Sequence, residues 1–244
     1  MSARGGRASA FAALYGKELR AYFDTPTAYV ITTVMVVISG YFFATPLFLQ
    51  NQAVMSGFIH MAPLLLLFFI PAITMRLYAE ELKSGTIEIL STLPVHDEDV
   101  LAAKFLAALT LVSFMLAGTL LYPLTLERLG DPDWGAILGS YAALLLMSAV
   151  YTAAGAWASS LTRNQVIAFI VAFLINFTLF LLGKIGDFLP DAVIGAASYL
   201  GLDVHIDRLS RGVLDTRDII YFASLTGFFL YLTYLNAQLR RQKG

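Results

Sequence analysis

Acidic side chains gather in one polar segment of this chain, residues 76–105, which reads RLYAEELKSGTIEILSTLPVHDEDVLAAKF. The segment carries six carboxylates: Glu80, Glu81, Glu88, Asp97, Glu98 and Asp99. These carboxylates can have either of two roles. They can complement the positive N-terminal ends of helices, or they can belong to an ordered element that docks onto a partner. Composition alone leaves both alternatives open.

The spacing within this segment predicts a helix, a break and a second, shorter helix. Arg76 lies one turn before Glu80, at the spacing of a helical ion pair. The Ser84-Gly85-Thr86 run breaks that helix, and its threonine can cap a short helix with Glu88 in the first turn. Pro94 ends this short helix.

The acids at 97–99 then open the next helix, where they complement its N-terminus. We expect Lys104 to extend toward the membrane interface as that helix becomes apolar. The whole connection is much longer than a turn and contains apolar residues that the chain itself does not need to bury. An ordered element of this kind usually docks onto a partner, and a solvated turn whose acids only cap helices is an equal alternative.

Other residues that could do chemistry form no convincing site. The histidines are far apart in the chain and form no H-E-x-x-H pattern: His60, His96 and His205. Asp203, His205 and Asp207 alternate, but a fourth metal ligand is missing, and Asp207 with Arg211 has the spacing of an ion pair. No G-x-x-x-x-G-K-[ST] phosphate loop occurs. We therefore expect no catalysis, cofactor or metal in this chain.

The elements around the polar segment are membrane-spanning helices. Hydrophobic residues make up 58% of the 244 residues and charged ones only 14%, and residues 25–75 contain no Asp, Glu, Lys or Arg. The apolar runs are long enough to cross a bilayer and are apolar on every face, which excludes alternating strands. The sequence predicts an all-α membrane protein with six spans: 28–49, 58–78, 103–126, 136–160, 164–183 and 218–238.

The basic residues predict the orientation. With both termini inside, eleven Lys and Arg residues lie on the cytoplasmic side and five lie outside. The polar segment is then cytoplasmic. The net charge of −1 and the lack of a basic stripe give no reason to expect nucleic-acid binding. No cleavable signal peptide and no cysteine are present.

Two further regions flank the spans. Apolar residues recur at helical spacing from Phe11 to Phe23, which predicts an N-terminal interfacial helix after a disordered cytoplasmic tail at 1–10, or a bent extension of the first span. Residues 11–244 form a single transmembrane domain. The outer connection, 184–217, mixes apolar and charged residues, as interfacial or re-entrant helices do. Asp215 and Asp218 can start the last span as its N-cap and first-turn acid.

No ionised side chain is expected at the centre of the membrane, which argues against a proton-coupled carrier or an ion pump. Asn176 is the strongly polar residue within a span, and a helix contact is the favoured role over a substrate site. A pathway without charges suits an apolar or amphipathic cargo.

The polar segment and its flanks, residues 71–109, resemble the signature of ABC-2-type permeases, the membrane subunits of ATP-driven exporters. The matching positions are Glu80, Glu81, Ser84, Gly85, Thr86, Glu88, Leu90, Pro94, Val95, Lys104 and Phe105. Residues 14–30 and 199–233 are similar to the subset called gliding-motility-associated permeases. The similarity is weakest from about 110 to 195, so the three stretches span most of the chain without covering it.

The resemblance implies what the polar segment does. In such permeases residues equivalent to 86–95 form a coupling helix seated on a cytoplasmic ATPase, and the outer helices close the pathway. ATP and Mg would be bound by that partner, present in two copies. Six helices are half of the usual assembly, which implies a second permease copy, as a homodimer or with a related chain. A periplasmic auxiliary subunit and surrounding lipid are further partners.

The expected function is thus a permease subunit in the bacterial inner membrane that moves an unidentified substrate outward. The alternative is a membrane anchor or force-transmitting subunit of an ATP-driven machine that moves no solute. Both need the same docking helix, so the sequence does not separate them. An ATP-independent carrier ranks third.

Overall fold

A computed structural model describes residues 2–49, 54–86, 96–130, 132–184, 201–212 and 215–242. Within these ranges the chain is helical, with no strand. The helices, in chain order, are α1 (Ser2–Phe23), α2 (Pro26–Leu49), α3 (Ser56–Thr74), α4 (Arg76–Ser84), α6 (Asp97–Gly118), α7 (Leu121–Glu127), α8 (Trp134–Leu161), α9 (Gln165–Lys184), α11 (Leu202–Ser210) and α12 (Thr216–Arg241).

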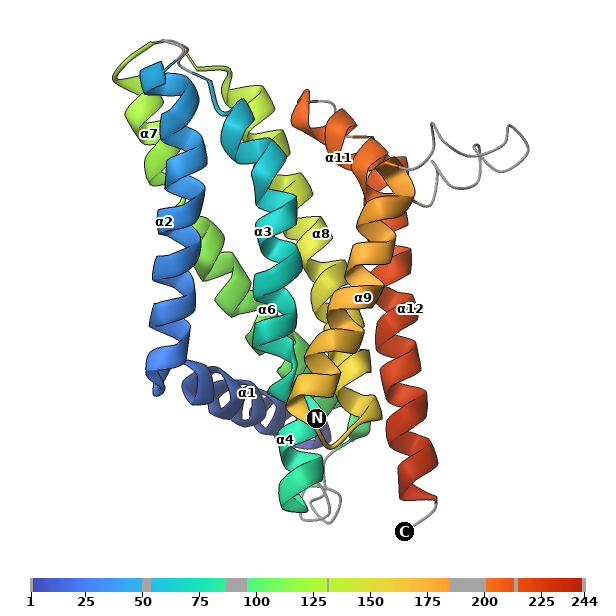
Figure 1. The fold of residues 1–244 in the computed structure, drawn as a ribbon. Coiled ribbons are helices and arrows are strands. Elements are labelled where there is room, and N and C mark those ends of the chain that lie inside the picture. Colours follow the sequence, from blue (N-terminus) through green and yellow to red (C-terminus); the bar gives the residue numbers. More distant parts are fainter. Residues whose placement is uncertain are drawn as a thin grey trace, which may run out of the picture.

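The expected six membrane-spanning helices are confirmed. Six helical stretches of the described chain are long and apolar enough to cross a membrane: Pro26–Leu49, Ser56–Ser84, Asp97–Glu127, Trp134–Leu161, Gln165–Lys184 and Thr216–Arg241. Each contains the expected span to within one residue. The second stretch joins α3 to α4 and the third joins α6 to α7, and the long helices stand side by side in Figure 1.

Helix α8 is the centre of the bundle. It packs against α3, α4, α6, α9, α11 and α12. Buried small residues form much of its surface, and at Gly155 a Cβ atom would lie only 2.1 Å from Thr74 Oγ1 of α3. Small residues allow helix backbones to approach closely, which is how helices pack where lipid removes most of the hydrophobic driving force. The α3–α8 contact therefore depends on this glycine.

The peripheral helices leave most of their apolar surface uncovered. In α8, 61% of the apolar stretch is buried, against 22% in each of α2, α9 and α12. Large apolar side chains such as Tyr41 and Ile220 are exposed on these helices. Such faces need lipid or another membrane helix as their neighbour.

Helix α1 runs across the ends of the upright helices and does not continue α2 (Figure 1). It packs against α6 and α2, with Tyr22 buried. It begins at Ser2, so the helix extends into residues 1–10, for which a disordered tail was expected. Helix α4 and the C-terminal end of α12 lie at the same end of the bundle, whereas α7 and α11 lie at the opposite end (Figure 1).

Candidate functional site

Lys104 is buried where α1, α4 and α6 meet, with 2% of its side chain exposed. Its Nζ donates hydrogen bonds to Glu81 Oε1 of α4 at 2.7 Å and to Glu18 Oε1 of α1 at 3.1 Å. The prediction that Lys104 extends toward the interface is wrong, because two carboxylates inside the protein offset the cost of burying its ammonium group. We call Glu18, Glu81 and Lys104 the junction.

Two tyrosine rings lie against cations at and beside the junction. The Lys104 ammonium lies 5.5 Å from the ring centroid of Tyr78, and the Arg76 guanidinium lies 4.9 Å from that of Tyr22. Burial raises the pKa of Tyr22, so it remains a neutral phenol that donates to the Ile73 carbonyl at 3.2 Å. The expected ion pair of Arg76 with Glu80 is absent from the described residues. The guanidinium instead stacks on an aromatic face.

A serine of α8 joins the two halves of the second span. Helix α3 ends at Thr74 and α4 begins at Arg76. Ser159 Oγ donates to the Met75 carbonyl at 2.8 Å and accepts from the backbone N–H groups of Tyr78 at 3.0 Å and Ala79 at 3.1 Å. One hydroxyl thus pairs backbone groups at the break and holds α4 on the central helix.

Replacing Ser159 with alanine should lower the free energy of unfolding by about 1–3 kcal/mol, because two buried N–H groups lose their acceptor. Thermal unfolding of the purified protein measures this. Ser148→Ala is the matched control: Ser148 is also buried in α8, but its hydroxyl bonds only within the helix, to Leu144 at 2.6 Å. Equal losses in the two variants would contradict the role of Ser159.

The far end of α4 confirms the predicted helix break. Gly85 is the C-cap, with φ of 75° and ψ of 0°, in the left-handed region that glycine adopts without steric cost. Ser84 Oγ bonds to the Glu80 carbonyl at 3.0 Å and to Thr86 Oγ1 at 2.8 Å. The chain therefore leaves α4 through a defined turn.

The residues expected to couple to an ATPase fall into three groups. Glu81 belongs to the junction, whereas Glu80, Ser84, Gly85 and Thr86 are exposed around the end of α4. The others lie outside the described residues: Glu88, Leu90, Pro94 and Val95. Their coupling role stays a prediction.

The N-terminal end of α6 agrees with the sequence. Asp97, Glu98 and Asp99 all occupy its first turn, where carboxylates meet the positive end of the helix dipole. Asp97 Oδ2 also lies 3.5 Å from Arg241 Nη1 at the end of α12. This contact brings the third and sixth spans together at the end of the bundle that carries the junction.

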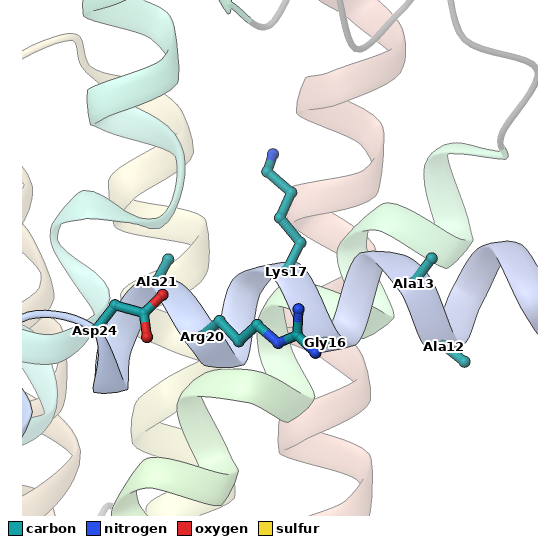
Figure 2. Close-up of a pocket in the computed structure, with 7 residues that line it drawn as sticks. All are labelled: Ala12, Ala13, Gly16, Lys17, Arg20, Ala21 and Asp24. Atoms are coloured by element: carbon teal, nitrogen blue, oxygen red, sulfur yellow. The ribbon is translucent and has the colours of Figure 1, made fainter.

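Helix α1 shows two different faces. Glu18 and Tyr22 point into the protein, whereas Lys17 and Arg20 are exposed. The exposed face holds a shallow depression of about 550 Å³ whose lining residues Figure 2 shows: Ala12, Ala13, Gly16, Lys17, Arg20, Ala21 and Asp24. Small side chains keep this depression shallow, and its charged lining residues are the cations Lys17 and Arg20 and the acid Asp24.

A second buried charged cluster lies at the opposite end of the bundle. Asp218 of α12 is fully buried, and its Oδ1 accepts from His205 Nδ1 of α11 at 2.6 Å and lies 3.0 Å from Arg208 Nη2. The His205 ring stacks on Tyr221, with centroids 4.0 Å apart. We call Asp218, His205 and Arg208 the outer cluster, where outer means only the end of the bundle away from the junction. It ties the short helix α11 to the start of the last span.

Sequence spacing assigned these charges partly wrongly. In the described part of α11 and its end, Asp207 and Arg211 form no ion pair with each other, and it is Arg208 rather than Arg211 that lies against a carboxylate, that of Asp218. Asp203 pairs with Lys184 at 3.0 Å, so the alternating acids do not converge on His205. Within the described ranges no three potential metal ligands gather in one place.

Two expectations for polar residues hold. Asp215 is the N-cap of α12, since its Oδ1 accepts from the Arg217 N–H at 2.9 Å. Asn176 is buried, and its Nδ2 lies 3.5 Å from the Tyr151 carbonyl of α8, which makes it a helix contact. The sequence analysis did not predict that Asp218 is buried. The one signal that it offered was the position of Asp218 in the first turn of α12.

In the described part of the chain, five apolar spans pack around a sixth that is rich in small residues, with a buried charged junction at one end, and this arrangement defines a multi-pass membrane protein. The family model described as ABC-2 family transporter protein matches residues 42–238, so the chain belongs to that family. A comparison with curated proteins finds no match. ABC-2 permeases are transport subunits rather than enzymes and typically work with an ATPase partner.

Proposed function

We propose that this permease subunit couples ATP hydrolysis by a separate ATPase to outward movement of an apolar or amphipathic substrate. The observation that carries the proposal is the junction. It joins Glu81, near the end of α4, to Lys104, near the start of α6. These helices flank residues 86–95 on both sides, so the proposed docking segment is held on two stems that are bonded to each other.

Force applied to residues 86–95 would therefore move α4 and α6 together. Lys104 passes this movement to α1 through Glu18, and Ser159 passes it to the central helix α8 through the Met75 break. Packed helices joined by short hydrogen bonds move as units, since stretching such a bond costs more than sliding an apolar contact. The ATPase would act on the whole end of the bundle rather than on one loop.

This end of the bundle faces the cytoplasm of a bacterium in the proposal, with both termini on that side. The exposed cations of α1 and the arginines ending α12 gather there, in keeping with an excess of basic residues on the cytoplasmic face. Helix α1 would lie in the interface with Lys17 and Arg20 available to lipid phosphates.

The proposed assembly contains two ATPase copies, which bind ATP and Mg, and a second permease, either identical or related. The uncovered apolar faces of α2 and α9 are suited to such a neighbour. The outer cluster would hold α11 over the outer end of the pathway. Likeness to the gliding-associated subset adds no assignment of its own, because it rests on residues 14–30 and 199–233 alone.

The charge reversal Glu88→Arg should lower vanadate-sensitive ATP hydrolysis of the purified complex by about tenfold. The change removes any contact that the Glu88 carboxylate makes with the ATPase, and it sets a positive charge against whatever group of the ATPase the carboxylate faced. The control is Glu127→Arg, the same change at an exposed glutamate that ends α7. Unchanged hydrolysis and unchanged recovery of the ATPase with the Glu88 variant would rule out docking through this segment.

A further inference from the structure

Two arginines meet at the end of the bundle that carries the junction. Arg163 lies in the turn between α8 and α9, and Arg240 lies in the last turn of α12 (Figure 1). Arg240 Nη2 donates to the carbonyl of Ser160 in the last turn of α8, which brings this guanidinium beside the turn that holds Arg163. The two cations lie close enough to repel each other.

Neither cation is neutralised within the described part of the chain. No carboxylate of the described ranges forms an ion pair with Arg163 or Arg240. The bond to Ser160 does not compensate the charge of Arg240, because a carbonyl is neutral, and this carbonyl already accepts from Asn236 Nδ2 at 2.8 Å. Two neighbouring guanidinium groups without an acid offer several N–H donors to the oxygen atoms of a phosphate.

Exposed apolar side chains flank the two arginines. Leu161 ends α8, Val166 lies in the first turn of α9, and Leu239 precedes Arg240 on α12; they are 47%, 63% and 55% exposed. All three belong to membrane-spanning stretches, so the arginines beside them lie where spans end and lipid headgroups begin. The occupant of this surface therefore needs an anionic group and an apolar chain, and an acidic segment of a soluble protein supplies only the first.

We propose that Arg163 and Arg240 together bind the phosphate of an anionic phospholipid of the phosphatidylglycerol type, whose acyl chains lie along Leu161 and Val166. A phospholipid with an amino headgroup would bring an ammonium group toward two cations, and this repulsion disfavours it. The site uses no residue of the junction or of the proposed docking segment, so it does not depend on the proposed transport activity.

Native mass spectrometry of the full chain tests this, with release from detergent that contains equal amounts of phosphatidylglycerol and phosphatidylethanolamine of identical acyl chains. We expect about fivefold preferential retention of phosphatidylglycerol, the size of charged contacts at a partly exposed site. Arg163→Gln, at an exposed position, should reduce this preference to about one. Arg240→Gln should do the same, since its amide can still donate to the Ser160 carbonyl.

Arg128→Gln is the matched control. It removes an exposed arginine that is the C-cap of α7, at the opposite end of the bundle, and should keep the preference of the wild type. Equal loss of preference in Arg128→Gln and Arg163→Gln would mean that the total charge of the protein selects the lipid, which overturns the proposal. Equal retention of the two lipids by the wild type overturns it as well.

Inorganic phosphate and the ATPase are the competing occupants. An excess of inorganic phosphate should leave phosphatidylglycerol bound, because phosphate has no chain to place on Leu161 and Val166. Complete displacement of the lipid would assign a site for free phosphate and overturn the proposal. Weaker recovery of the ATPase with Arg163→Gln, at unchanged lipid preference, would make an acidic segment of the ATPase the occupant and also overturn it.

Val166→Trp provides a second readout at an exposed position. In vesicles, brominated phosphatidylglycerol should quench the added tryptophan more strongly than brominated phosphatidylethanolamine at the same mole fraction, after subtraction of the wild-type signal. Adding Arg163→Gln to this variant should remove the difference. A difference that persists without Arg163 contradicts phosphate binding by the two arginines.

Discussion

Replacing Lys104 with methionine should lower the free energy of unfolding by about 3 kcal/mol. The substitution keeps the length of the side chain but leaves Glu81 and Glu18, only 18% and 15% exposed, facing each other without their cation. Removing one partner from a buried ion pair leaves an uncompensated charge, and this is the main cost. Thermal unfolding in detergent or lipid nanodiscs measures the loss.

Two controls separate this effect from loss of packing. Lys17→Met removes a cation that also lies near Glu18, at 3.9 Å, but is 64% exposed, so it should change stability by no more than about 0.5 kcal/mol. The triple variant Lys104→Met, Glu18→Gln, Glu81→Gln removes all three charges and should recover most of the loss. Wild-type stability of Lys104→Met alone would show that the junction contributes nothing.

The junction variant also bears on coupling. If Lys104→Met unfolds at a lower temperature but still assembles with the proposed ATPase, the proposed coupling predicts ATP hydrolysis that depends less on the membrane subunit, because the bonds through which α4 would move α1 are lost. The matched measurement on Lys17→Met should show normal dependence. Normal dependence in both variants would confine Lys104 to a structural role.

The second large effect is expected at the outer cluster. Asp218→Asn keeps the shape of the side chain but removes the charge that accepts from His205 at 2.6 Å, and should cost about 3 kcal/mol. Most of this comes from the fully buried contact with His205, since Arg208 is 42% exposed and can turn to water. Hydrogen exchange should rise across residues 202–210 before the rest of the protein opens.

Asp207→Asn is the control for this variant, since Asp207 is an exposed acid on α11, the helix that Asp218 of α12 anchors, and its loss should change stability by less than about 0.5 kcal/mol. Exchange in α11 that is equally slow in wild type and Asp218→Asn would contradict the anchoring of that helix by the outer cluster.

Features that depend only on neighbouring residues in the sequence could be predicted. The six spans follow from the length of the apolar runs, because bilayer thickness imposes that length on any sequence. The break at Gly85 and the N-cap at Asp215 follow from local backbone chemistry, and both appear where expected.

The partners of charged and polar side chains could not be predicted, since they depend on which helices meet. Arg76 has Glu80 at ion-pair spacing yet stacks on Tyr22 of α1. Arg211 has Asp207 at the same spacing, yet Arg208 is the residue bound to Asp218. Spacing within one helix shows what is near on that helix but not what the neighbouring helix offers.

The sequence by itself therefore determined the class of the protein, the number of its spans and its family resemblance, because hydrophobic length and local motifs are properties of short stretches. Only the tertiary structure decided that Lys104 is enclosed by Glu18 and Glu81 and that Ser159 holds the break at Met75. These residues are 86, 23 and 84 positions from their partners. A charge can be buried at low cost only when groups distant in the sequence lie beside it as partners, and helix packing decides which groups do so.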